Sequence, residues 1–215
     1  MNLTRIMEVL HMPVWESMEW SHISWSSPEK NERILFLGDS ILGGYGGTVE
    51  KALGDRFSIG KLISSKAVDN IYLIKEVGLM IDEFGRNDSI KLVHVNNGLH
   101  GIWHLTPENY KICYDYYIQS IMEKTPSSKI VLALSTPVRV GGDEYKYHKI
   151  NDRVLRANET VRELGQKYSL TVNDLYSIVD KRQDYDAGDG LHFNAEGSKA
   201  LGEKVLEVVT NELEL

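Results

Sequence analysis

Short apolar runs alternate with longer segments of helical periodicity along most of the chain. The runs end at Gly, Asn, Ser or Pro, as buried strands do, and the segments between them repeat apolar residues every three or four positions. We expect strands at 33–38, 56–65, 89–98, 129–136 and 170–177, and helices at 68–84, 106–124, about 149–168 and 194–213. Repeated strand–helix units predict an α/β fold, with a parallel sheet covered by helices on both faces.

The first 32 residues do not follow this alternation. They contain Trp15, Trp20 and Trp25, which we interpret as an N-terminal extension (1–32) packed on the body of the protein. A lid over a binding site is the alternative. No linker interrupts residues 33–215, which we expect to form one domain.

Composition narrows the classes of function. The chain has 215 residues and a formal net charge of −7, which argues against general affinity for nucleic acid. No run approaches the roughly 20 apolar residues of a membrane helix. The N-terminal segment lacks the apolar centre of a signal peptide, so we expect a cytoplasmic protein. The single cysteine, Cys113, fits that compartment, and no His, Cys and Asp spacing predicts a metal site.

The stretch ILFLGDSILGGYG (34–46) places a serine directly after the first strand. In an open parallel sheet, ligands bind beyond the carboxyl ends of the strands, and Ser40 falls at such an end. If a helix begins there, its N–H groups favour negative charge at the same point. We interpret Ser40 as a nucleophile whose attack produces an oxyanion; the alternative is a Ser/Gly turn that only caps a helix.

The stretch DAGDGLHFNAEG (186–197) supplies the base that such a serine needs. Asp189 and His192 stand three residues apart before the last helix, so one loop carries both side chains. We predict that His192 accepts the Ser40 proton and that Asp189 orients the ring. Asp186 is a nearby alternative carboxylate.

With these two stretches the sequence resembles the SGNH (GDSL-like) hydrolase family, in its esterase and acylhydrolase branch. GDSILGGYG resembles the nucleophile block and DGLH the terminal block, and the resemblance covers about 33–213. It implies a three-layer, flavodoxin-like fold with five parallel strands. It also implies an acyl-enzyme mechanism without metal or other cofactor, with Ser40, His192 and Asp189 as the catalytic triad.

The resemblance is incomplete at the two other blocks, which carry oxyanion donors in this family. GRND (85–88) matches the third block literally but precedes its strand, so we align Gly98-Leu99-His100-Gly101 there instead. The implied oxyanion hole is the Ser40 N–H, His100 and the backbone of Ser65, with Asn96 or Asn97 as an alternative to His100 and Ser64 as an alternative to Ser65.

The candidate substrate contacts lie in or beside the same blocks. They are Asp39, Asn97 and Gly98, and Trp103, which follows the third block.

We therefore expect a serine esterase acting on a small-molecule or glycan ester, with short acyl groups such as acetyl on carbohydrate preferred. An acyltransferase with the same triad and a non-catalytic flavodoxin-like binding module are the alternatives. The sequence gives no oligomeric state.

Overall fold

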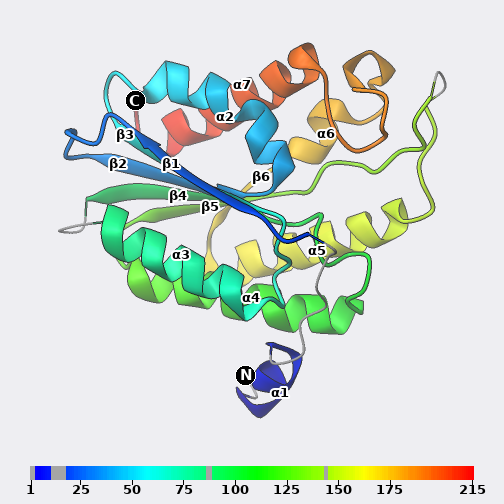
Figure 1. Ribbon diagram of the computed structural model, residues 1–215, viewed down its shortest axis with the longest axis horizontal. Coiled ribbons are helices and arrows are strands. Elements are labelled where there is room, and N and C mark those ends of the chain that lie inside the picture. The colour runs from blue at the N-terminus through cyan, green and yellow to red at the C-terminus, as the bar shows by residue number, and fades with distance from the viewer. Residues whose placement is uncertain (1–2, 11–17, 86–88, 143–144) are drawn as a thin grey trace.

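One mixed sheet organises the protein. The computed structural model describes residues 3–10, 18–85, 89–142 and 145–215. The six strands run in the order β1-β3-β2-β4-β5-β6 (Figure 1). Their bounds are β1 Ser21–Ser26, β2 Arg33–Gly38, β3 Ser58–Ser64, β4 Ile90–Asn96, β5 Lys129–Ala133 and β6 Thr171–Asn173. Strands β2 to β6 are parallel and follow the flavodoxin-like order, whereas β1 is antiparallel to β3.

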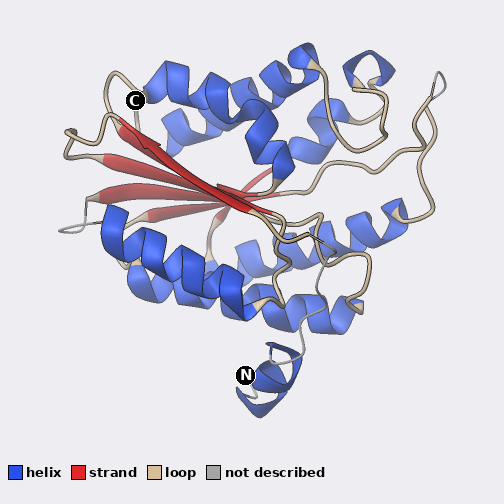
Figure 2. Cartoon of the chain, in the orientation of Figure 1, coloured by secondary structure: helices blue, strands red, loops and turns tan. Residues whose placement is uncertain are grey.

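Helices cover both faces of the sheet, which confirms the predicted three-layer fold. Helices α2, α6 and α7 lie on one face, and α3, α4 and α5 lie on the other (Figures 1 and 2). Their bounds are α1 Leu3–Leu10, α2 Ser40–Leu53, α3 Ile71–Phe84, α4 Pro107–Lys124, α5 Asn151–Tyr168, α6 Leu175–Val179 and α7 Ala195–Glu212, with a 3-10 turn, η2, at Gln183–Tyr185. Among the described residues, no helix has the length and apolarity to cross a bilayer.

Strand β2 lies at the centre of the core. Its residues Ile34–Leu37 are almost completely buried, because helices cover both faces of a parallel sheet. Apolar residues of the helices on either side belong to the same buried core, including Leu42 from α2 and Tyr114 from α4. The central strand that leads to Ser40 is therefore fixed from both sides.

The N-terminal segment contributes a sixth strand that the sequence analysis did not predict. SHISWS has no apolar run, and β1 forms by pairing with β3 over Ser21↔Ser64 to Ser26↔Ile59. Farther upstream, Ile6 and Leu10 of α1 are buried. Trp15 lies outside the described residues. The division of the chain at residue 32 stays a prediction.

Several element boundaries differ from the expected ones, and two of these differences have a local cause in a helix cap. The predicted strand 170–177 ends early, because the Asp174 side chain accepts the Ser177 N–H and caps helix α6. Helix α3 begins at Ile71 rather than at 68, because the side chain of Asn70 accepts the Tyr72 N–H and serves as its N-cap.

Candidate active site

Ser40 is the first residue of α2, immediately beyond the carboxyl end of β2. Strand β2 ends at Gly38, and the carboxylate of Asp39 caps the helix by accepting the Ile41 N–H at 2.9 Å. Gly38 permits this sharp connection, since a Cβ there would lie 2.8 Å from Leu42 Cβ and 2.9 Å from the carbonyl oxygen of Asn96. The hydroxyl therefore stands at a helix N-terminus, where unpaired N–H groups favour negative charge.

The loop before α7 brings an imidazole to that hydroxyl. His192 Nε2 lies 2.8 Å from Ser40 Oγ, and His192 Nδ1 lies 2.6 Å from Asp189 Oδ2. If Nδ1 carries the proton and donates it to the carboxylate, Nε2 is the acceptor for the serine hydroxyl. The structure thus brings together the three residues that the sequence assigned to the triad.

Asp189 is held by its other oxygen as well. Oδ1 accepts the backbone N–H groups of Leu191 at 2.9 Å and His192 at 2.8 Å. Partial burial raises the pKa of Asp189, but the hydrogen bonds from the His192 ring and from these two N–H groups outweigh it and lower the pKa to about 2. Asp189 is therefore a carboxylate at neutral pH, as an orienting acid must be.

Asp186, the alternative carboxylate, faces a different partner. Its Oδ1 lies 3.3 Å from Nη2 of Arg139, and its side chain is 4% exposed. Of the two carboxylates, the one in contact with the imidazole is Asp189.

Two of the predicted oxyanion donors, His100 and Ser65, lie in different surroundings. His100 lines the cavity in front of Ser40. Ser65 does not fit its expected role, because its N–H donates to the carbonyl oxygen of Trp20 at 3.1 Å. Its hydroxyl also donates to Glu19. The alternative, Ser64, is paired with Ser21 of β1. Both serines hold the N-terminal segment, so assigning Ser65 to the oxyanion hole was wrong.

Three of the four candidate substrate contacts are buried structural residues. Asp39, Asn97 and Gly98 do not line the cavity; Asp39 and Asn97 are each 1% exposed, and Gly98 packs against Ser135. Trp103 is half exposed and does line the cavity. Of the four candidate contacts, Trp103 is therefore the one that can touch a substrate in this cavity, and the other three support the loops behind it.

Asp39 joins the nucleophile turn to the loop after β4. Besides the Ile41 N–H, its carboxylate accepts the backbone N–H groups of Gly98 and Leu99. Burial raises the pKa of Asp39 above its usual range, against the opposing effects of His100 and of these N–H groups. Its role is to fix the two loops relative to each other.

The cavity at the triad has a volume of about 410 Å³. It is lined by Trp20, Ser40, Ile41, Leu99, His100, Trp103, Leu191 and His192. Trp20 was assigned to an extension packed on the body, and the structure places it on the cavity wall. Trp20 lies on the wall because it directly precedes β1, which pairs with β3. The local sequence contains no pattern that predicts this strand pairing.

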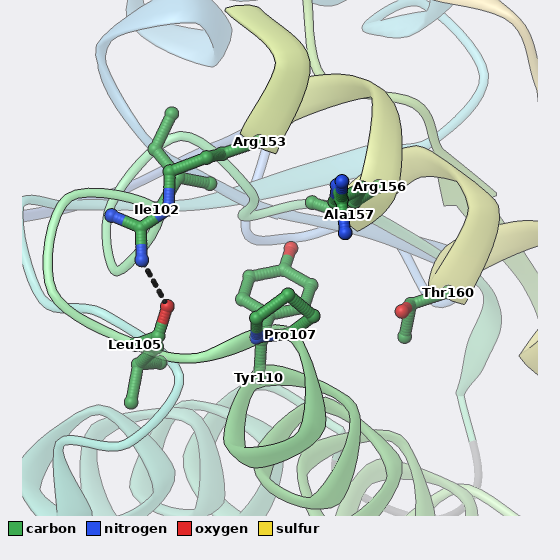
Figure 3. A pocket seen from close by; sticks show the side chains of 8 residues that line it. All are labelled: Ile102, Leu105, Pro107, Tyr110, Arg153, Arg156, Ala157 and Thr160. Carbon is green, nitrogen blue, oxygen red and sulfur yellow. Dashed lines mark hydrogen bonds between the residues drawn. The ribbon is translucent and has the colours of Figure 1, made fainter. Parts of the chain in front are cut away.

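A second cavity, between α4, α5 and the loop before α4, is too small for a substrate. Its volume is about 20 Å³, enough for a single water. Figure 3 shows the side chains that line it. Arg153 donates to the carbonyl oxygen of Leu105 beside it, and the ring of Tyr110 points into it. None of the three predicted triad residues lines it.

The remaining polar candidates are structural. His94 is fully buried beside Asn173, and Tyr145 and Tyr147 bond to Asp180. Arg139, on the connection after β5, is 3% exposed and does not line the cavity. In the described parts of the chain, no three His, Cys, Asp or Glu side chains are grouped to hold a metal ion. The GRND asparagine and aspartate lie outside the described residues.

Comparison with known proteins identifies the family of this chain. The GDSL-like lipase/acylhydrolase family matches residues 36–200. A curated relative, GDSL esterase/lipase WDL1 from Oryza sativa subsp. japonica, is 28% identical over 141 residues, 61% of this chain. The chain spans about half of that relative, 53%.

Solved structures share the fold at low identity. A GDSL-like lipase from Bacteroides thetaiotaomicron VPI-5482 has a TM-score of 0.64 at 15% identity, with 85% of this chain and 90% of that chain covered. A catalytic mutant of Axe2, an acetylxylan esterase from Geobacillus stearothermophilus, has a TM-score of 0.63 at 15% identity, with 83% and 94% covered. The match spans most of the chain, from the strand before Ser40 to the helix after His192, and the protein belongs to the GDSL-like lipase/acylhydrolase family.

Proposed function

We propose that this protein is a serine esterase that hydrolyses carboxylic esters through an acyl-enzyme. One observation carries the proposal: His192 Nε2 lies 2.8 Å from Ser40 Oγ while its Nδ1 lies 2.6 Å from Asp189. A nucleophile, a base and an orienting carboxylate within hydrogen-bond distance are the requirements for acyl transfer by serine. Family membership supports the same chemistry.

In the first half-reaction Ser40 Oγ bonds to the ester carbonyl carbon while its proton passes to His192 Nε2. The carbonyl oxygen becomes an oxyanion at the N-terminus of α2, where the Ser40 N–H and the His100 side chain are the donors we assign. Asp189 stabilises the imidazolium. When the carbon–oxygen bond to the alcohol breaks, the imidazolium returns the proton to the leaving oxygen.

In the second half-reaction water takes the place of the alcohol. His192 removes a proton from the water, whose oxygen attacks the acyl carbon; the bond to Ser40 then breaks, and the proton returns to Oγ. The acid is released and the serine restored. The His192 and Asp189 side chains are 44% and 50% exposed, so water reaches the pair, as hydrolysis requires.

For the substrate class we propose short acyl esters of carbohydrate. Trp20 and Trp103 are 39% and 50% exposed and line the cavity that contains Ser40, offering apolar ring faces to a sugar. A volume of about 410 Å³ accommodates an acetyl group with one sugar ring. The fold neighbour from G. stearothermophilus is an acetylxylan esterase, which supports this choice.

Labelling by a fluorophosphonate tests the catalytic assignment, because only an activated serine reacts. The wild type should be labelled and should turn over p-nitrophenyl acetate, and Ser40→Ala should do neither. Ser177→Ala, at an exposed serine on α6, is the matched control and should behave as the wild type. Labelling or full turnover by Ser40→Ala would overturn the proposal, and an unlabelled wild type that binds glycans would favour the binding module.

The substrate class needs a separate test. Trp20→Ala and Trp103→Ala should raise KM for acetylated xylo-oligosaccharides several-fold and change kcat/KM for p-nitrophenyl acetate much less. Equal effects on both substrates would contradict a sugar-binding role. Products formed with added alcohols would reveal acyl transfer. The cytoplasmic location and the absence of nucleic-acid partners stay predictions.

A further inference from the structure

The guanidinium of Arg139 lies beneath the loop that carries Asp189 and His192. Its side chain is fully buried, and Nη2 donates to Asp186 Oδ1 at 3.3 Å and to the carbonyl oxygen of His192 at 3.2 Å. The guanidinium carbon also lies 4.8 Å from the centre of the Phe193 ring. One side chain thus contacts the loop at both ends, at 186 and at 192–193.

The backbone of Arg139 holds the middle of the same loop. Its N–H donates to the carbonyl oxygen of Gly190 at 2.8 Å. Gly190 has φ of +78°, and a Cβ there would lie 2.3 Å from the Arg139 carbonyl oxygen. The close approach requires glycine, because any larger residue would push the loop away.

Burying the ion pair between Arg139 and Asp186 costs free energy of desolvation. Within the part of the chain that the structure describes, Arg139 Nε and Nη1 and Asp186 Oδ2 are buried and have no hydrogen-bond partner. A buried ion pair recovers its desolvation cost only when its geometry is good and its remaining polar atoms are satisfied. Stability alone therefore does not account for a buried arginine here, and its contacts with the loop point to geometry instead.

We propose that Arg139 is a positioning residue, which sets the loop 186–193 so that the His192 ring meets both Ser40 and Asp189. The inference rests on the proposed esterase function, in which His192 is the base. Arg139 touches neither Ser40 nor the cavity and acts through the His192 backbone and Asp186. Displacing a catalytic group by 1 Å costs about 10²-fold in rate.

The variants Arg139→Met and Arg139→Lys distinguish a positioning role of Arg139 from a purely structural one. Met keeps the apolar stem and removes the donors; Lys keeps the charge but not the planar fork. Arg139→Met should lower kcat for p-nitrophenyl acetate by about 10–100-fold with KM little changed. Arg139→Lys should recover part of that loss. Arg182→Met, at an exposed Arg–Asp pair with Asp184, is the matched control and should retain wild-type kcat.

A readout independent of catalysis separates this inference from the esterase proposal. The His192 Nδ1 proton in its short hydrogen bond to Asp189 should give a strongly deshielded proton NMR signal. We expect the signal in the wild type and in Ser40→Ala, and its broadening or loss in Arg139→Met at a temperature where the variant is folded.

Two outcomes would overturn the inference: an unchanged signal with unchanged kcat in Arg139→Met, or a lower melting temperature as the only effect. Wild-type turnover by Ser40→Ala would instead defeat the esterase proposal, and the signal would still report on loop geometry. If Arg139→Met does not fold, Asp186→Asn keeps the shape and removes the charge partner, and the same loss of kcat and of signal is expected.

Discussion

Ser40 Oγ and His192 Nε2 lie 2.8 Å apart although 152 positions separate them in the chain. The serine is brought by the end of β2 and the histidine by the loop before α7, and these elements meet because α2 packs against α7. The two helices approach closely at Gly202, where a Cβ would lie 2.7 Å from Thr48 Cβ. The site is therefore a consequence of helix packing on one face of the sheet.

Asp189→Asn should remove the orienting carboxylate while keeping its shape. The amide presents an N–H or a carbonyl to Nδ1 and no longer stabilises the imidazolium, so kcat should fall by about 10⁴-fold. Turnover of p-nitrophenyl acetate measures this, with Asp184→Asn as the control because Asp184 is exposed and pairs with Arg182. An Asp189→Asn enzyme within tenfold of the wild type would remove Asp189 from the triad.

His100 provides a test of oxyanion stabilisation. Removing one donor of this kind costs about 10²–10³-fold in kcat, which is the loss we expect for His100→Ala. His100→Asn should retain more activity than His100→Ala, because its amide can still donate. Steady-state kinetics with p-nitrophenyl acetate measure this loss. An unchanged kcat in His100→Ala would show that His100 lines the cavity but does not stabilise the oxyanion.

Gly98 packs so closely against Ser135 that no larger side chain fits at this position. A Cβ at Gly98 would lie 1.8 Å from Ser135 Oγ and 3.2 Å from Ser135 Cβ. Gly98→Ala should therefore lower the free energy of unfolding by about 1–3 kcal/mol, the usual cost of overpacking. Adding Ser135→Ala removes the oxygen and should recover much of that loss in urea unfolding. Strictly additive effects of the two substitutions would contradict the steric explanation.

His94 should make the fold sensitive to acid. Burial lowers its pKa to about 3, so the native state excludes a proton that the unfolded chain binds below a pKa of about 6.5. The unfolded state then holds more protons, and stability must fall as the pH decreases from 6.5 towards 3.

His94→Gln keeps an acceptor for the amide of Asn173, 3.2 Å from His94 Nε2, and removes this proton uptake. Below pH 6 the wild type should lose up to about 1.4 kcal/mol per pH unit relative to the variant. Urea unfolding at pH 7, 6 and 5 measures the difference. Parallel stability curves for the two proteins would show that His94 does not contribute.

The sequence alone predicted the five parallel strands, the helices α3, α4, α5 and α7, and the placement of Ser40, Asp189 and His192 at strand ends and in one loop, whereas α2 was only a condition and α6 was not expected. These follow from local chemistry: apolar runs end at Gly or Asn, capping residues such as Thr106 and Asn194 begin helices, and a parallel sheet gathers strand ends at one edge. Asp186 stayed open as an alternative to Asp189, because both lie on the loop that carries His192, and the contact of the Asp189 carboxylate with His192 Nδ1 distinguishes them.

The tertiary structure decided what depends on contacts between distant segments. SHISWS becomes a strand only through pairing with β3, and this pairing uses the N–H of Ser65 and brings Trp20 to the cavity. Asp39 is buried because the loop after β4 closes over it, and Arg139 is buried because the loop 186–193 does the same. Hydrogen-bond partners and burial depend on how the chain packs, and neither is encoded in the residues next to the position concerned.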